Sequence, residues 1–108
     1  MASEHAYLDY ILEQLSDADG ISFRAMMGEF ILYRFGAVFG GIYDNRLLVK
    51  NVPAARAILP QARPEEPYPG GRPMLLVEEV DDRELLCGLV RAMQDELPPV
   101  KKKKPSAR

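Results

Sequence analysis

The stretch from residue 24 to residue 50 constrains the fold most, because short apolar segments alternate in it with turn-forming residues. Aromatic and β-branched side chains concentrate in residues 30–35 and 38–43, a composition typical of β-strands. Residues that tolerate tight turns separate these segments. We therefore predict a series of short antiparallel strands. The predicted strands are residues 21–27, 30–35, 38–43 and 46–50, and the predicted turns are Gly28–Glu29, Gly36–Ala37 and Asp44–Asn45.

The strands also carry expectations about packing. Alternation within residues 21–27 places Met26 and Met27 on opposite sides of the sheet. Residues 30–35 are more apolar than strict alternation requires, so we expect burial on both faces for part of that strand. The Gly40–Gly41 pair inside a strand indicates a bulge or a close approach of another backbone.

Helices are predicted at both ends of the chain. Residues 4–15 place apolar side chains at the spacing of one helical face, with Ser3 as the predicted N-cap. The C-terminal helix covers about residues 82–97. Its start has a capping-box pattern, with Asp81 as N-cap and Glu84 three residues later.

A short middle helix and a proline-rich loop complete the pattern. The helix begins at Pro53, which is tolerated in a first turn, and Asn51 is its predicted cap. Residues 60–73 contain five prolines and form the longest irregular segment, a length that is often functional in a compact domain. Residues 74–80 form the last predicted strand.

Length and composition agree with one globular domain. The chain has 108 residues, 47% hydrophobic and 28% charged, which is ordinary for a soluble domain. We predict the α+β class: a single domain with an antiparallel sheet of about five strands, flanked by N-terminal and C-terminal helices and one short middle helix. No apolar run reaches the length of a membrane span, the N-terminus lacks a signal-peptide pattern, and one cysteine cannot form an internal disulfide. We expect a cytoplasmic protein without membrane contact.

Charge is distributed unevenly. The domain, residues 1–100, carries nine basic and all sixteen acidic residues, a net charge of −7, whereas residues 101–108 are basic. We predict that this tail is disordered. An acidic body is a poor surface for a phosphate backbone, so direct binding of nucleic acid is not expected from the folded part. Weak, salt-dependent binding through the tail is the least favoured hypothesis.

Catalytic and metal-binding patterns are weak. The chain has one histidine, His5, and one cysteine, Cys87, without partners at metal-ligand spacing. Cys87 falls near the buried stripe of the last helix, where cysteine behaves as a small inert hydrophobe. The paired acids Glu78–Glu79 and Asp81–Asp82 are explained by a helix start. We therefore predict no enzyme activity, no cofactor and no metal.

Arg24, Met26, Met27 and Glu29 form the most interesting group. A strand end with a methionine pair is a candidate for an exposed interaction surface, because methionine packs against varied partners. The alternative is structural, with one methionine in the core and Arg24 paired with Glu29. The residues alone leave both open.

Three segments give a family resemblance: residues 24–29, RAMMGE; residues 40–50, GGIYDNRLLVK; and residues 68–78, YPGGRPMLLVE. In this order they resemble the TfoX (Sxy) N-terminal domain family, over about residues 4–97. The resemblance implies a small α+β domain with an antiparallel sheet flanked by helices. It also implies a relation to regulators of natural competence, which promote transcription of DNA-uptake genes together with the cyclic-AMP receptor protein. Those regulators carry a second helical domain, so this chain resembles a stand-alone N-terminal domain.

Two functional hypotheses follow. The first is a non-enzymatic regulatory domain, a transcriptional co-regulator that acts through protein contacts, with homodimerisation by edge-strand pairing or through the methionine surface. The alternative is a sensor of small anions. Its pocket would lie between the sheet and the loop 60–73, lined by Arg24, Tyr43, Lys50 and Arg72, whose basic groups can hold an anion.

Overall fold

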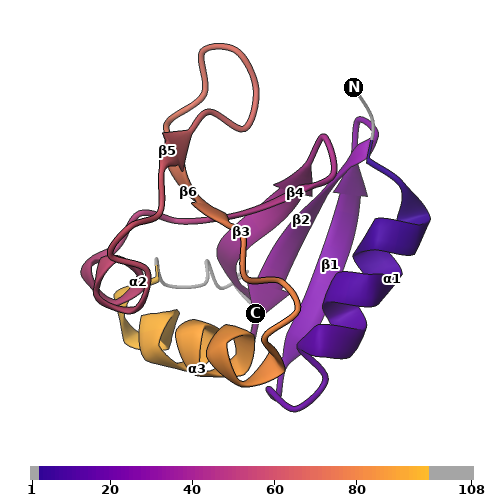
Figure 1. The fold of residues 1–108 in the computed structure, drawn as a ribbon. Helices are drawn as coiled ribbons and strands as arrows, with labels where there is room; N and C mark the ends of the chain where they lie inside the picture. The colour runs from indigo at the N-terminus through magenta and orange to yellow at the C-terminus, as the bar shows by residue number, and fades with distance from the viewer. Residues whose placement is uncertain (1–2, 98–108) are drawn as a thin grey trace, which may run out of the picture.

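The computed structural model describes residues 3–97 and has the predicted α+β architecture, one open antiparallel sheet with three α-helices (Figure 1). The sheet has six strands in the order β1-β2-β3-β4-β6-β5. The sixth strand, β5, lies inside the proline-rich segment that we expected to be irregular, and it pairs with β6. In chain order the elements are α1 (His5–Gln14), β1 (Ile21–Met26), β2 (Glu29–Arg34), β3 (Ala37–Tyr43), β4 (Arg46–Val49), α2 (Pro53–Ile58), β5 (Pro64–Glu65), β6 (Met74–Val77), α3 (Arg83–Met93) and a 3₁₀ turn (Gln94–Glu96).

Two-residue turns join the first four strands. They are Met27–Gly28, Phe35–Gly36 and Asp44–Asn45, and all six residues have positive φ. Positive φ at both central positions is the requirement of the type I′ hairpin turn. The Asp44–Asn45 turn is confirmed. The other two begin one residue earlier than predicted, because the glycine occupies the second position of the turn and a methionine or a phenylalanine is held in the left-handed region at the first.

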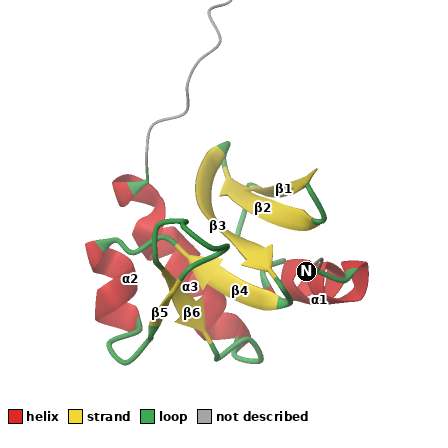
Figure 2. Cartoon of the chain, turned by 90° about the horizontal axis from the view of Figure 1, so that it is seen from above, coloured by secondary structure: helices red, strands yellow, loops and turns green. Residues whose placement is uncertain are grey.

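Pleating gives the sheet two different faces. One face, the core face, is covered by α1 and α3, and α2 packs beside α3 (Figure 2). The strand side chains buried in the core are Phe30, Leu32, Ala37, Phe39, Ile42, Leu47, Val49, Leu75 and Val77. The opposite face, the outer face, carries alternate residues such as Ile31 and Tyr33, which are only partly buried. Within the described residues, helices therefore cover only the core face of the sheet.

Burial on both faces occurs in β4 rather than in β2. In β2 the burial alternates strictly, so the expectation for residues 30–35 is wrong. In β4 the neighbours Leu47 and Leu48 point to opposite faces and are both buried. The difference follows from position, because β4 lies between β3 and β6 in the middle of the sheet, whereas β2 is next to the edge strand β1.

The glycine pair in β3 permits a close approach, as predicted. A Cβ on Gly40 would lie 2.2 Å from the carbonyl oxygen of Leu48 on β4. The register against β2 also shifts here: Leu32 pairs with Gly40 but Tyr33 pairs with Val38, so one residue of β3 bulges out. Glycine at position 40 therefore lets β3 and β4 pair at their observed separation.

The two long helices begin one residue later than predicted. The N-cap of α1 is Glu4, without a side-chain cap, because the hydroxyl of Ser3 is bonded elsewhere. The N-cap of α3 is Asp82, whose carboxylate accepts the N–H of Leu85 at 3.1 Å. Asp81 instead accepts the hydroxyl of Tyr10. The capping function is present, but tertiary contacts determine which acidic residue performs it.

The ends of three other segments differ in detail. The N-cap of α2 is Val52 rather than Asn51, whose amide oxygen accepts a hydrogen bond from Arg56. The last strand, β6, ends at Val77, and α3 passes at Met93 into the 3₁₀ turn. The tail 101–108 lies outside the described residues. Within residues 3–97, no helix has the length and apolarity needed to cross a bilayer.

The close approach at Gly40 is testable by stability. A Gly40→Ala variant would force a methyl group against backbone atoms, and we expect the free energy of unfolding to fall by about 1–3 kcal/mol, the usual cost of overpacking. Gly88→Ala on α3 is the matched control, since a methyl group there would meet no other part of the domain within 4 Å. Alanine favours a helix, so this control is expected to gain up to about 1 kcal/mol. Urea unfolding measures the free energy of unfolding of both variants. Equal values for Gly40→Ala and Gly88→Ala would contradict the close approach.

Candidate functional site

The loop of residues 66–73 lies against the outer face of the sheet and is anchored there by aromatic packing. The rings of Tyr68 and Tyr43 meet edge to face with centroids 6.4 Å apart. The N–H of Gly71 donates to the carbonyl of Tyr68 at 2.9 Å, and Gly71 is buried under the same ring. Pro67 is also buried. The loop is therefore held in a defined conformation over the end of β3.

An ion pair holds the base of this loop. Arg46 at the start of β4 lies 2.5 Å from the carboxylate of Glu65, and both side chains are 29% exposed. The same guanidinium donates to the carbonyls of Tyr43 and Glu66. Arg46 thus joins the β3–β4 hairpin to β5, and its charge is neutralised within the structure.

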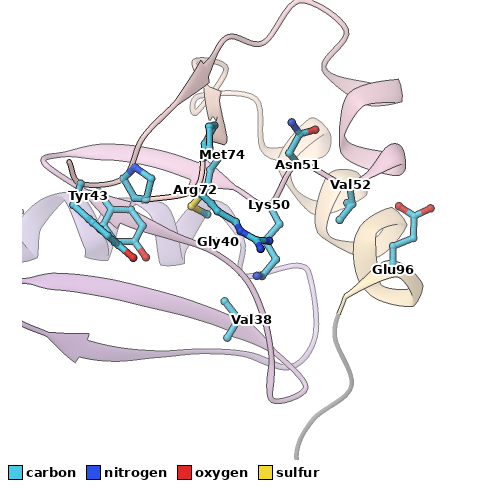
Figure 3. A pocket seen from close by; sticks show the side chains of 12 residues that line it. Val38, Gly40, Tyr43, Lys50, Asn51, Val52, Arg72, Met74 and Glu96 are labelled. Atoms are coloured by element: carbon cyan, nitrogen blue, oxygen red, sulfur yellow. The ribbon is translucent and has the colours of Figure 1, made fainter. Parts of the chain in front are cut away.

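A pocket opens between the loop, the outer face of β3 and the segment that leads into α2. Its volume is about 470 Å³. Tyr43, Lys50 and Arg72, which we selected from the sequence, all line it, and Figure 3 shows the side chains of Lys50 and Arg72 reaching into it. Arg24 does not line the pocket; it is exposed on β1, opposite Ile31 of β2. The structure thus brings together three of the four residues that we predicted to line a pocket.

The two cations of the pocket have no acidic partner in the part of the chain that the structure describes. Within residues 3–97, neither Lys50 nor Arg72 forms an ion pair or a side-chain hydrogen bond. The carboxylate in the wall, Glu96, accepts the backbone N–H of Ala54 at 2.8 Å at the start of α2. Two cations and one engaged carboxylate leave the pocket with a formal charge of +1, on a domain whose net charge is −7.

The phenol of Tyr43 adds a hydrogen-bond donor. Burial raises its pKa, and the neighbouring phenol of Tyr68 and carboxylate of Glu29 raise it further. The hydroxyl is therefore protonated at neutral pH. Apolar walls come from Val38, Pro67 and Met74. The pocket thus combines positive charge, a hydrogen-bond donor and apolar walls.

Sequence reasoning missed several lining residues. Val38, Met74 and Glu96 come from three different elements, and no local pattern links them. Tyr68 gave a usable signal, because a lone aromatic residue in a proline- and glycine-rich loop needs a packing partner. The partner, Tyr43, is known only from the fold.

The methionines of the proposed interaction surface are both exposed. Met26 on β1 is 48% exposed, and Met27 at the hairpin turn is 95% exposed. The alternative, with one methionine in the core and Arg24 paired with Glu29, is contradicted, because no such pair exists among the described residues and neither methionine is buried. The reason is that Met27 belongs to the turn and Met26 to an edge strand.

Glu29 has a structural role that the sequence did not indicate. Its carboxylate accepts the hydroxyl of Ser3 at 2.5 Å and the backbone N–H of Asp44 at 3.1 Å. The Ser3 hydroxyl in turn accepts the N–H of Asn45, whose side chain accepts the N–H of Glu4. This network, the Glu29 clamp, ties two hairpins to the start of α1.

The other two residues considered in the sequence, Cys87 and His5, pack against neighbouring parts of the domain. Cys87 is buried in α3 with its Sγ 3.6 Å from the carbonyl oxygen of Gln14, as expected for an inert cysteine. His5 lies exposed in the first turn of α1, edge to face with Phe30. In the described part of the chain, no three His, Cys, Asp or Glu side chains lie close enough together to hold a metal ion.

The chain is similar to one curated protein that itself has no assigned function. It is 28% identical, over 105 residues, to an uncharacterized 12.7 kDa protein from the trpE 5′ region of Spirochaeta aurantia; the match covers 96% of this chain and 91% of that protein. No family model matches the chain, and no solved structure matches it. The resemblance to the TfoX N-terminal domain family stays a prediction.

The Glu29 clamp generates a stability prediction. Glu29→Ala removes the acceptor shared by Ser3 and Asp44. We expect the free energy of unfolding to fall by about 1–2 kcal/mol. Two fully buried hydrogen bonds to a carboxylate would contribute more, but this site is partly exposed. Glu79→Ala is the control, since the Glu79 carboxylate has no hydrogen-bond partner within residues 3–97. Thermal unfolding measures both; a Glu29→Ala variant as stable as the control would show that the clamp is unimportant.

Proposed function

We propose that this domain is a non-enzymatic binding module that senses a small anionic ligand in the pocket beneath the 66–73 loop. The observation that carries the proposal is a pair of cations on the wall of one pocket, Lys50 and Arg72, which have no acidic partner among residues 3–97. Elsewhere on this acidic domain, guanidinium groups such as those of Arg46 and Arg83 pair with carboxylates. A cation pair left without a carboxylate is suited to a phosphate or carboxylate group of a ligand.

The chemical groups that line the pocket limit the class of ligand that it can bind. Lys50 and Arg72 provide charge, the Tyr43 hydroxyl provides a neutral donor, and Met74 and Pro67 provide an apolar wall. A small organic phosphate or carboxylate satisfies all three features. A bare inorganic ion uses only the charge, so it binds more weakly than an organic anion of equal charge.

Thermal stability in the presence of anions tests this proposal. Inorganic phosphate, citrate and adenosine monophosphate, each added to the full chain, are the probes. A ligand at one hundred times its dissociation constant stabilises the native state by about 2.7 kcal/mol, so a bound anion raises the melting temperature. We expect Lys50→Gln and Arg72→Gln to abolish this rise.

Arg63→Gln is the matched control for loss of one positive charge. Arg63 is exposed, forms only a 3.5 Å ion pair with Glu78, and does not line the pocket. It should keep the response to anions. An equal response in all three variants, or no response of the unchanged chain to any of the anions, would sink the proposal.

A second candidate function is protein contact through the β1–β2 hairpin, with the domain acting as a transcriptional co-regulator. The exposure of Met27 at the tip of this hairpin and of Met26 beside it favours this function, because methionine suits adaptable interfaces. The resemblance to the TfoX N-terminal domain family supports a partner in the transcription machinery. This proposal does not need the pocket.

Site-specific crosslinking tests the second candidate. A photoreactive amino acid in place of Met27 is expected to crosslink to RNA polymerase or to a transcription factor in native lysate. The same group in place of the exposed residue Gln61, far along the chain from the hairpin, is the control. Loss of the crosslink in a Met26→Lys background would support the contact, and crosslinking of the same protein from both positions would contradict it.

A further inference from the structure

Within residues 3–97, no strand pairs with the outer edge of β1. The geometry of this edge points to a second copy of this chain as its partner. We infer that two copies pair antiparallel along β1, about a two-fold axis at Phe23, into one continuous sheet. This inference does not rest on the pocket, because β1 and the β5–β6 end lie at opposite ends of the sheet (Figure 2).

The hairpin turn determines which backbone groups of β1 are free. In a two-residue hairpin the residues that flank the turn, here Met26 and Glu29, exchange hydrogen bonds. Alternation along the strand then directs the backbone N–H and C=O groups of Arg24 and Ser22 toward β2 as well. The carbonyl of Gly20 continues the series, since it accepts the N–H of Phe35 at 2.8 Å. The backbone groups of the intervening residues point to the open edge; these residues are Ile21, Phe23 and Ala25.

The two edges of the sheet differ in their capacity to pair. The far edge strand, β5, has two residues, and its first, Pro64, has no N–H to donate. Strand β1 has six residues, and its register with β2 is continuous, without a bulge. It contains neither proline nor lysine, which commonly protect an edge, and Arg24 is its single charged residue. Of the two edge strands in the described sheet, β1 is therefore the one that is better able to pair with another strand.

Exposed side chains on β1 favour association. Phe23 is 43% exposed on the core face, where its ring meets that of Phe30 edge to face at 6.0 Å. A groove lined by Leu12, Ile21 and Phe23 runs between α1 and β1. In the paired sheet, the two Phe23 rings lie directly opposite each other, and aromatic cross-strand pairs are stabilising.

Charge selects the register and makes the strand self-complementary. With the axis at Phe23, Ile21 pairs with Ala25 of the second copy, and Arg24 lies opposite Ser22 of the second copy. Moving the axis to Arg24 would place two arginines directly opposite each other, which is destabilising. Moving it to Ser22 would pair Ala25 with a residue before the strand. The axis at Phe23 uses the whole strand and opposes no like charges, as an isologous interface requires.

Sedimentation equilibrium of the full chain tests the inference. We expect a concentration-dependent dimer, because one strand pair forms a small interface. Phe23→Glu places two carboxylates opposite each other at the axis and should make the chain monomeric. Gln61→Glu adds the same charge at an exposed position between α2 and β5, away from the β1 edge, and should leave the dimer unchanged. Thermal unfolding of both variants verifies that they are folded.

A gain-of-affinity variant tests the register itself. Ser22→Glu places a carboxylate opposite Arg24 of the second copy, twice per dimer, and is expected to lower the dissociation constant about two- to thirtyfold. No change in affinity for Ser22→Glu would overturn the register. A chain that is monomeric at every concentration, or a dimer that survives Phe23→Glu, would overturn the inference and leave the edge to a strand of another protein.

Discussion

The register of the first four strands depends on three two-residue turns with positive φ at both positions. A turn of this kind determines which residues face each other, and a slip of one residue would move every side chain of a strand to the other face. Here the turns place Leu32 and Ile42 toward the helices and Ile31 and Tyr33 away from them. The distinction between a core face and an outer face therefore begins in the turns.

Glycine in β3 connects this register to the pocket. A Cβ on Gly41 would lie 2.6 Å from the Tyr43 ring, so the absence of a side chain leaves room for that ring on the outer face. Tyr43 in turn supports Tyr68, and Tyr68 covers Gly71. From the sequence, the glycine pair predicts only a bulge or a close approach of backbones. In the structure, Gly41 also leaves room for the Tyr43 ring, against which the 66–73 loop packs.

The proposed ligand pocket and the proposed dimer edge are compatible with each other. The edge strand β1 is at one end of the sheet, and the loop between β5 and β6 is at the other. Pairing along β1 would leave both pockets open to solvent. The Glu29 clamp lies between the two regions: its carboxylate holds the turn after β3, which ends at Tyr43, and it belongs to the hairpin that carries Met27.

Local patterns in the sequence determined the α+β class, the two long helices, the Asp44–Asn45 turn and the close approach at Gly40, because each depends on neighbouring residues. They also selected Tyr43, Lys50 and Arg72, through the expectation that a long loop would cover the sheet. Only the tertiary structure decided that Arg24 lies away from this pocket and that Asp82, rather than Asp81, caps α3. It also decided that Pro64–Glu65 forms a strand and that Glu29 joins two hairpins. These features depend on contacts between residues distant in the chain, for which local propensity contains no information.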